Sequence, residues 1–454
     1  MDYLIGLDIG TSSVKGVLMT LAGEVIYTTR EKFNYCKLNK SQTELIPNEY
    51  LSSCYLAIRD LVMKNKGGDI KAVCASSASG NLLFLDKENK PLTNIIGWQD
   101  MRVENEAEEM LQHLDHEELY RCAGWKFDFH TFPLAQLCYV RKHQPELLGI
   151  ENKICMSTEY LYYTLTGNWG ISCSAATPSY LIMQEKGSYN KDLLEAVGIQ
   201  EEQLPPILES GKVLGISTKE AELFCGLPKG TPIVLGTFDH PSAARGVGVL
   251  EEGQMLLSCG TSWVTFSPIQ NREKGLRMNG LLDPFLSTSG CYGVMTSIAS
   301  LAERLDFYVS RYIDSSNQKF EKLSELAMQS KKGAAGLQID ILEEPNDDII
   351  TNYEKKHIAR AIMEGTTRLL KEKIELLNKH GISTTKTVMV GGPSEDSYWI
   401  ELISEMCNID VEVKYGSFAG AVGAAILAGI GIGIYKSEKH AQEVINGRNK
   451  QCLD

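Results

Sequence analysis

Leu7-Asp8-Ile9-Gly10-Thr11-Ser12-Ser13-Val14 is a stretch that the chain repeats, in altered form, as Leu257-Ser258-Cys259-Gly260-Thr261-Ser262-Trp263-Val264. Each copy lies between two apolar runs, so each predicts two antiparallel strands joined by a Gly-Thr-Ser turn. Such a turn exposes backbone N–H groups and hydroxyls that suit phosphate oxygens. One such turn is weak evidence, because turns often contain these residues. Two copies in matching contexts predict a duplicated unit that binds an anion.

The composition sets limits on the partners of this protein. A length of 454 residues predicts two or more domains, and 43% hydrophobic with 23% charged residues is typical of a globular protein. The net charge of −13 argues against a general affinity for nucleic acid or anionic membranes. The start Met1 to Leu4 lacks the basic region of a signal peptide, and the 12 cysteines contain no C-x-x-C pair. We therefore expect reduced thiols and a cytoplasmic protein.

An uncharged run from Phe418 to Tyr435 spans 18 residues, the lower limit for a transmembrane helix. The run is rich in glycine and alanine, so it is only mildly hydrophobic. Gly429, Gly431 and Gly433 interrupt it near its end. These features favour a buried helix that packs closely through small residues over a membrane span.

The order of the expected elements indicates an α/β fold with mixed sheets. The chain begins with strands over Tyr3–Ile9, Val14–Thr20 and Glu24–Thr28, and each half then alternates helices with strands. Residues 98–185 are mostly helical by period and rich in aromatics, and the turn from Trp125 to His130 predicts a pocket wall. We place the domain boundary near residue 245, which gives domains 1–245 and 246–454.

The residues that could carry chemistry fit phosphoryl transfer, which needs phosphate-binding loops, a divalent cation and an acceptor for a hydroxyl proton. Asp8 precedes the first turn, where the second copy has Ser258. A carboxylate there would repel phosphates unless a cation lay between them, so Asp8 predicts a Mg²⁺ site. The alternative is that Asp8 only caps the turn. Lys15 either neutralises phosphate or is an exposed charge on an edge.

Asp239 follows a buried strand over 231–236, and ligands of open α/β sheets lie at the carboxyl ends of strands. A carboxylate there could take the proton of an attacking alcohol. The alternative is a helix N-cap, since Asp before His-Pro-Ser is a good helix start. Gly391-Gly392 ends another strand, and glycines there allow close approach by a flat ring or ribose.

Together these motifs resemble the FGGY carbohydrate kinases, whose fold is shared by actin-like, Hsp70-like and hexokinase-like ATPases. The resemblance runs from about Tyr3 to Tyr435. Its motifs are the two phosphate turns from Asp8 and from Ser258, the Gly236-Thr237-Phe238-Asp239 element, Val388 to Pro393 with Trp399-Ile400, and Gly420-Ala421-Val422-Gly423-Ala424-Ala425.

The resemblance implies two actin-like, ribonuclease H-like domains with a cleft between them, in which ATP and Mg²⁺ bind. It implies ATP-dependent phosphorylation of a sugar hydroxyl with Asp239 as the base. Dimers are common in the family, so we expect a homodimer or a monomer. The expected metal residues are Asp8 and Asp239. The expected ATP-binding residues are Gly10, Thr11, Ser12, Ser13, Lys15, Gly260, Thr261, Gly391, Gly392 and Ser394.

The sugar-binding segments match the family only in part. Trp98-Gln99-Asp100-Met101-Arg102 resembles its Trp-x-Asp-x-Arg element, but Ser79-Gly80 lies where xylulokinase- and gluconokinase-like sequences carry Met-His. We expect a ketose, polyol or sugar acid as substrate, with a ketopentose or deoxy-ketohexose favoured. The expected substrate-binding residues are Ser79, Gly80, Asn81, Trp98, Asp100, His130, Asp239 and His240.

Two other readings of the same fold stay open at this point. One is an actin-like or Hsp70-like ATPase without a sugar pocket, against which the Trp98 to Arg102 element argues. The other is a non-catalytic sugar sensor, against which the presence of both Asp8 and Asp239 argues.

Overall fold

A computed structural model describes residues 2–286 and 291–447 of the chain. The chain forms two compact units. The first contains Met1–Leu250, Leu281–Tyr292 and Phe418–Asp454, and the second contains Glu251–Gly280 and Gly293–Ser417. This division differs from the contiguous domains 1–245 and 246–454, because the C-terminal segment packs with the N-terminal sheet.

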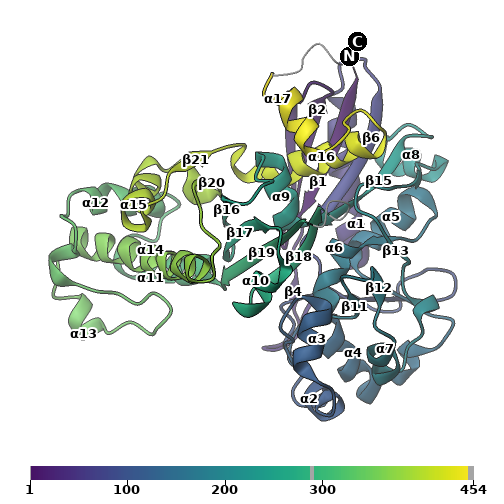
Figure 1. Ribbon diagram of the computed structural model, residues 1–454, viewed down its shortest axis with the longest axis horizontal. Helices are drawn as coiled ribbons and strands as arrows, with labels where there is room; N and C mark the ends of the chain where they lie inside the picture. Colours follow the sequence, from purple (N-terminus) through teal and green to yellow (C-terminus); the bar gives the residue numbers. More distant parts are fainter. Residues whose placement is uncertain (1, 287–290, 448–454) are drawn as a thin grey trace. The chain divides into compact units, whose positions relative to one another are not determined.

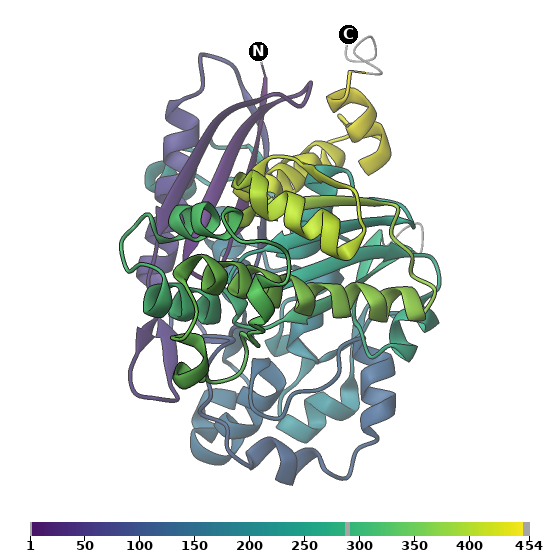
Figure 2. The ribbon, with the colours of Figure 1, turned by 90° about the vertical axis from the view of Figure 1, so that its left-hand side faces the viewer.

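The first unit is organised on a mixed sheet in the order β14-β15-β6-β1-β2-β3. Of these strands, Figure 1 labels β1, β2, β6 and β15, and Figure 2 shows the N-terminal strands in purple. β2 is antiparallel to β1, as the repeated turn predicts, whereas β6 is parallel to both β1 and β15. The carboxyl ends of β1, β6 and β15 therefore meet at one edge of the sheet. The strands are β1 (Tyr3–Ile9), β2 (Ser13–Thr20), β3 (Val25–Lys32), β6 (Ile70–Ser77), β14 (Val213–Ile216) and β15 (Pro232–Phe238).

Helices cover both faces of this sheet. Alternate residues of β1 point to opposite faces, and all of its residues are buried, so each face needs a covering layer. Ile5 and Leu7 pack in the cluster that contains α1 (Pro47–Met63), and Leu4 packs in the cluster that contains α16 (Ala419–Gly431). α16 also packs against α9 (Asp239–Val247), beside β1 in Figure 1. A Cβ on Gly6 would lie 1.9 Å from the Ala421 carbonyl oxygen, so the helix approaches the strand through small residues.

The prediction of a buried small-residue helix is thus confirmed for residues 419–431. In the part of the chain that the structure describes, no helix has the length and apolar character needed to cross a membrane. The polar sequence from Lys436 onward predicts a partly helical tail, and it contains α17 (Glu438–Ile445). The last residues of this tail, 448–454, lie outside the described residues.

Residues 98–185 are less helical than predicted, since short strands separate the helices. The first unit also contains β4 (Cys36–Lys37), β5 (Thr43–Leu45), β7 (Leu83–Leu85), β8 (Ile95–Ile96), β9 (Lys153–Cys155), β10 (Ile171–Ser172), β11 (Ile182–Met183), β12 (Ser188–Tyr189), β13 (Ile207–Leu208) and β18 (Leu281–Leu286). Its remaining helices are α2 (Glu106–Leu111), α3 (His116–Ala123), α4 (Phe132–His143), α5 (Ser157–Thr166), α6 (Cys173–Ala176), α7 (Lys191–Val197) and α8 (Lys219–Cys225).

Within the second unit the strands follow the order β19-β17-β16-β20-β21, with β16 antiparallel to β17 and parallel to β20. The long helix α14 packs against α11, α12 and α15. The strands are β16 (Gln254–Cys259), β17 (Trp263–Ile269), β19 (Cys291–Ile298), β20 (Lys386–Gly391) and β21 (Val411–Val413). The helices are α10 (Arg272–Arg277), α11 (Leu301–Tyr312), α12 (Lys319–Met328), α13 (Asp347–Ile350), α14 (Lys355–Lys379) and α15 (Ser397–Cys407).

Candidate functional site

The two repeated stretches form the two hairpins that the sequence predicts. Residues 10–12 join β1 to β2, where the Gly10 N–H donates to the Ser13 carbonyl at 3.0 Å. Residues 260–262 join β16 to β17, where the Gly260 N–H donates to the Ser262 carbonyl at 3.2 Å. Thr11 is partly exposed and Thr261 is exposed, so both hydroxyls are accessible to a ligand.

The parallel strands of the first unit bring three predicted elements together at one edge. The first turn follows β1, residues 78–81 follow β6, and Asp239 follows β15. The Ala78 N–H donates to the Ile9 carbonyl at 2.9 Å, and Phe238 pairs with Ser77. The phosphate turn, the small-residue loop and the carboxylate therefore lie at neighbouring strand ends.

Asp8 is a buried carboxylate at this edge. Its pKa is raised to about 6 in total: burial raises it most, Lys15 and His240 lower it, and the neighbouring Asp239 raises it. The Lys15 ammonium lies 3.7 Å from Asp8 Oδ2, so this lysine is paired with Asp8 rather than exposed on an edge. Asp8 pairs with Lys15 inside the hairpin ladder, and backbone groups close the turn, so the geometry does not give Asp8 the role of a turn cap.

The backbone of α16 lies directly against Asp8. A Cβ on Gly420 would lie 2.7 Å from Asp8 Cγ, so only glycine fits at this place without a shift. The Gly420 carbonyl accepts a hydrogen bond from Ser242 Oγ at 2.8 Å, which ties α16 to α9. The Gly-Ala helix thus fixes the position of both the Asp8 strand and the helix that begins with Asp239.

Asp239 is the first residue of α9 and is partly exposed. Its Oδ1 accepts the His240 backbone N–H at 2.7 Å, and the His240 ring nitrogen Nε2 lies 3.8 Å from the same oxygen. Phe238 occupies the N-cap position, so the alternative of Asp239 as N-cap does not hold. Within residues 2–286 and 291–447, no hydrogen bond engages Asp239 Oδ2, which leaves that oxygen available to a substrate.

The predicted metal residues fit a magnesium ion by their chemistry. No group of three or more His, Cys, Asp or Glu side chains in the described residues could hold a metal by itself. Asp8 and Asp239 are close enough to influence each other electrostatically. Mg²⁺ is usually held by one or two carboxylates, with water and phosphate oxygens as its other ligands, so this pair suits it.

A chain of aromatic rings leads from Trp98 to the residue after Asp239. The ring centroids are 6.2 Å apart for Trp98 and Phe132, 5.9 Å for Phe132 and Trp125, 5.5 Å for Trp125 and Phe238, and 5.4 Å for Phe238 and His240. Gly80 has φ +98°, and a Cβ there would lie 2.7 Å from Phe132 Cδ1. The site prediction missed Phe132 and Phe238. The available signals were the aromatic-rich segment 98–185, which contains Phe132, and the Gly236 to Asp239 element, which contains Phe238.

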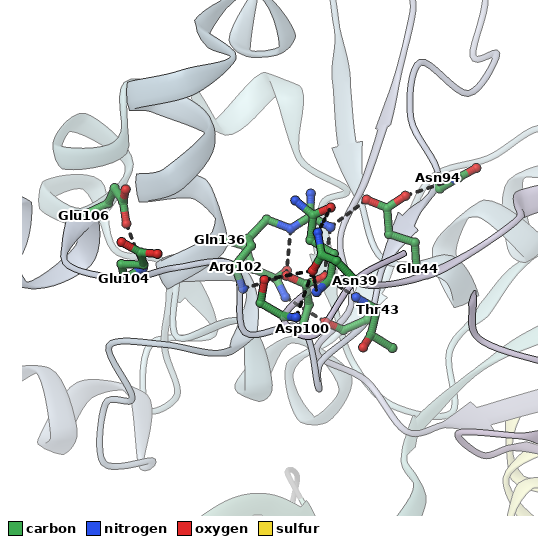
Figure 3. A network of polar contacts seen from close by, with 12 residues as sticks. Asn39, Thr43, Glu44, Asn94, Asp100, Arg102, Glu104, Glu106 and Gln136 are labelled. Carbon is green, nitrogen blue, oxygen red and sulfur yellow. Dashed lines mark hydrogen bonds and ion pairs between the residues drawn. The ribbon is translucent and has the colours of Figure 1, made fainter. Parts of the chain in front are cut away.

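Asp100 is occupied by partners within the protein. It is fully buried, and its carboxylate accepts hydrogen bonds from Thr43 N at 2.6 Å and from three nitrogens of Arg102 at 2.7 to 3.1 Å. A carboxylate offers about four lone-pair positions, so these bonds saturate it. Arg102 also pairs with Glu44, 2.6 Å away (Figure 3). The predicted sugar contact of Asp100 is therefore corrected to a role in shaping the loop that carries Trp98.

The other predicted sugar residues differ in how many of their polar atoms are already bonded within the protein. Asn81 is engaged with α5, since its side chain donates to Ser157 Oγ at 3.0 Å and accepts the Ser157 N–H at 2.8 Å. Ser79 makes a long contact of 3.5 Å to Ser77 Oγ, so its hydroxyl is more available. His130 is exposed, with Nδ1 3.3 Å from the Val103 carbonyl oxygen.

In the second unit, Gly391 lies beside the turn formed by residues 260–262. Cys259 pairs with Gly391, which has φ +100°, and a Cβ on Gly391 would lie 2.3 Å from the Cys259 carbonyl oxygen. Ser394 Oγ donates to the Gly391 carbonyl at 2.6 Å, so its hydroxyl is engaged. Gly392, in contrast, has no heavy atom within 4 Å of a Cβ position. Gly260, Gly391 and Gly392 thus lie at one edge of this sheet.

Comparisons with known proteins agree with this architecture. The N-terminal domain model of the FGGY family of carbohydrate kinases matches residues 3–246, and the C-terminal domain model matches residues 255–432. The xylulose kinase of Bacillus subtilis (strain 168) is 26% identical over 464 residues, which cover 98% of this chain and 91% of that protein.

Solved structures share the fold. A ligand-bound xylulose kinase from Lactobacillus acidophilus has a TM-score of 0.86 at 20% identity, and a gluconate kinase from the same organism has a TM-score of 0.84 at 20% identity. Each comparison covers 98% of this chain and 92% of that structure. The predicted two-domain α/β fold is confirmed. With both family models matched in order, the chain belongs to the FGGY family of carbohydrate kinases and is a sugar kinase.

Proposed function

We propose that this kinase transfers the γ-phosphoryl group of ATP to a hydroxyl of a small neutral ketose, with the ketopentose xylulose as the first candidate. The observation that carries the proposal is the meeting of Asp8, the Thr11 turn and Asp239 at one sheet edge, beside the aromatic chain. The similarity to xylulose kinases over nearly the whole chain supports the choice of sugar.

Asp239 is the proposed general base. Its Oδ2 takes the proton of the attacking hydroxyl, while its Oδ1 is held by the His240 backbone N–H. This bond fixes the orientation of the carboxylate before the sugar arrives. Proton transfer to a positioned base typically contributes about 10²–10⁴-fold to the rate.

The two turns are the proposed phosphate-binding loops. Backbone N–H groups and hydroxyls come from Gly10, Thr11, Ser12 and Ser13 in the first unit, and from Gly260 and Thr261 in the second.

The proposed adenosine site is formed by Gly391 and Gly392, because Gly392 has open space where a side chain would stand. Mg²⁺ bound with ATP would neutralise phosphate charge, and Asp8 and Asp239 would hold it, with Lys15 nearby.

The charges around the proposed sugar site favour a neutral substrate over a sugar acid. Ser79 and Gly80 carry no charge. The guanidinium of Arg102 is occupied by Asp100 and Glu44, and Arg245 is buried and paired with Glu438 at 3.2 Å. A sugar carboxylate would therefore find neither of these arginines available, whereas the rings of Trp98 and Phe132 suit the C–H faces of a neutral sugar.

A coupled assay of ADP release tests the proposal. We expect turnover with xylulose or another ketose in a panel of ketoses, polyols and sugar acids, and little with the acids. Asp239→Asn should keep ATP binding and lower kcat by about 10²–10⁴-fold.

The metal assignment is tested by Asp8→Ala, which should raise the Mg²⁺ concentration needed for half-maximal rate. Normal turnover of Asp239→Asn, or a preference for sugar acids, would contradict the corresponding part of the proposal.

A further inference from the structure

The pairing of β15 with β6 is irregular just before Asp239, the residue that follows β15. Leu235 pairs with Ala75 and Phe238 pairs with Ser77, so β15 has one residue more than β6 over this interval. Such a bulge bends the strand and redirects the side chains that follow it. A Cβ on Gly236 would lie 2.0 Å from the Ala75 carbonyl oxygen, so glycine is required here.

At the bulge, three consecutive backbone N–H groups of β15 donate to side-chain hydroxyls instead of to carbonyls of the neighbouring strand. The Gly236 N–H donates to Tyr162 OH at 2.9 Å, the Thr237 N–H to Ser76 Oγ at 3.2 Å, and the Phe238 N–H to Ser174 Oγ at 3.1 Å. All three hydroxyl residues are buried. Buried backbone N–H groups need such partners, and here each consecutive N–H group has its own. Ser174, from α6, holds the Thr237–Phe238 peptide group, and of the three N–H groups this one lies closest to Asp239 along the chain.

Asp283 fixes the direction of the Ser174 hydroxyl. Ser174 Oγ donates to Asp283 Oδ2 at 2.6 Å, and because a hydroxyl has a single hydrogen, its lone pairs are then left for the Phe238 N–H. Asp283 is 1% exposed, and its Oδ1 has no hydrogen-bond partner in the described residues. A buried carboxylate with an unpartnered oxygen is costly. Packing alone would not favour a carboxylate at this position.

We propose that Asp283 and Ser174 form a positioning pair that aims the Asp239 carboxylate by holding the Phe238 peptide. The inference rests on the proposed role of Asp239 as base. Neither Ser174 nor Asp283 touches the substrate. The peptide group is planar and stiff, so a fixed Phe238 N–H limits the movement of the Phe238 Cα, to which Asp239 is joined through the next peptide group. A displacement of about 1 Å at a reacting group can lower a rate by about 10²-fold.

The test compares Ser174→Ala, Asp283→Ala and Asp283→Asn in the whole protein, with xylulose and Mg·ATP or with the most active sugar of the panel. We expect Ser174→Ala and Asp283→Ala to lower kcat by about 10–100-fold, while the KM for ATP changes by less than about twofold. Asp283→Asn should keep most of the rate, because its amide oxygen accepts the same hydrogen bond. If Asp283→Ala does not fold, the other two variants carry the test.

Ser217→Ala is the matched control. Ser217 is equally buried, its Oγ accepts the Thr231 N–H at 2.9 Å and donates to the Pro228 carbonyl at 2.6 Å, and it lies at the opposite end of β15. Ser217→Ala should lower the melting temperature about as much as Ser174→Ala and leave kcat unchanged. Equal and unchanged kcat values in both variants would overturn the proposal.

A second comparison separates this inference from the proposed function. In the Asp239→Asn background, adding Ser174→Ala should lower the residual rate no further, because the pair acts through the base. A further 10-fold loss in that background would show that Ser174 acts elsewhere and would overturn the inference. Full activity of Asp239→Asn alone would instead remove the base assignment, and the positioning role with it.

Discussion

The indole N–H of Trp98 donates a hydrogen bond to the hydroxyl oxygen of Thr11, 3.3 Å away. The two residues are far apart in the sequence, one in the Trp-x-Asp-x-Arg element and the other in the first Gly-Thr-Ser turn. Because Thr11 accepts this bond, its own hydrogen remains available for a phosphate oxygen. The bond connects the proposed sugar-binding element with the proposed phosphate-binding turn.

Trp98→Phe should therefore affect phosphate binding as well as sugar binding. The phenyl ring keeps the stacking on Phe132 but lacks the N–H group. We expect kcat/KM for ATP to fall about 2–10-fold, the effect of one neutral hydrogen bond. A double-mutant cycle with Thr11→Val measures the coupling. Additive losses would show that the hydrogen bond does not contribute.

Asp100→Ala should lower stability more than it lowers the intrinsic rate. The change leaves the buried Arg102 with Glu44 as its remaining carboxylate partner, so we expect the free energy of unfolding to fall by about 3 kcal/mol. The KM for the sugar should rise because the Trp98 loop loses its support. Denaturant unfolding and steady-state kinetics measure the two effects.

Lys142→Ala is the control for this change, since Lys142 and Glu109 form an exposed ion pair at 2.9 Å. Exposed pairs contribute little to stability, so this variant should unfold almost as the parent does. A loss for Asp100→Ala no larger than that of the control would contradict the structural role of Asp100.

The neighbouring glycines at the end of β20 should respond differently to alanine. Gly391→Ala places a Cβ 2.3 Å from the Cys259 carbonyl oxygen at φ +100°, so we expect a loss of stability of several kcal/mol. Gly392→Ala has open space and should fold normally, but its methyl group would enter the proposed adenosine site and raise the KM for ATP. Thermal melts and ATP titrations distinguish the two, and an unchanged KM in Gly392→Ala would contradict the adenosine assignment.

Glu159→Gln should change how stability depends on pH. Burial raises the pKa of Glu159 to about 7 from its usual 4.5, although the Met156 N–H bonds to it at 2.9 Å. Between these values the folded protein holds a proton that the unfolded chain releases, so stability falls as pH rises from about 4.5 to about 7. At about 1.4 kcal/mol for each pKa unit, the difference reaches about 3 kcal/mol above pH 7.

Glutamine keeps an oxygen for the Met156 N–H and carries no charge. The variant should therefore be more stable than the parent at pH 8 by an amount on the order of 3 kcal/mol, and close to it in stability near pH 4.5. Denaturant unfolding at both pH values gives the comparison. Parallel stability curves for the two proteins would contradict the raised pKa.

The sequence predicted what depends on short stretches of the chain. The alternation and the Gly-Thr-Ser turns were enough to predict both hairpins, and the strand before Asp239 was enough to place that carboxylate at a strand end. The resemblance to the FGGY family then predicted the two-domain fold. These features are local, because a turn or a strand is specified largely by adjacent residues.

The tertiary structure decided what depends on residues far apart in the chain. It placed α16 in the first unit, where Gly420 lets the helix meet Asp8, and it turned Asp100 inward to Arg102. It also linked Ser174 and Asp283 to the Phe238 N–H, one residue before Asp239. Such contacts follow from close packing and from the need of each buried polar group for a partner, and neither is encoded in any one segment.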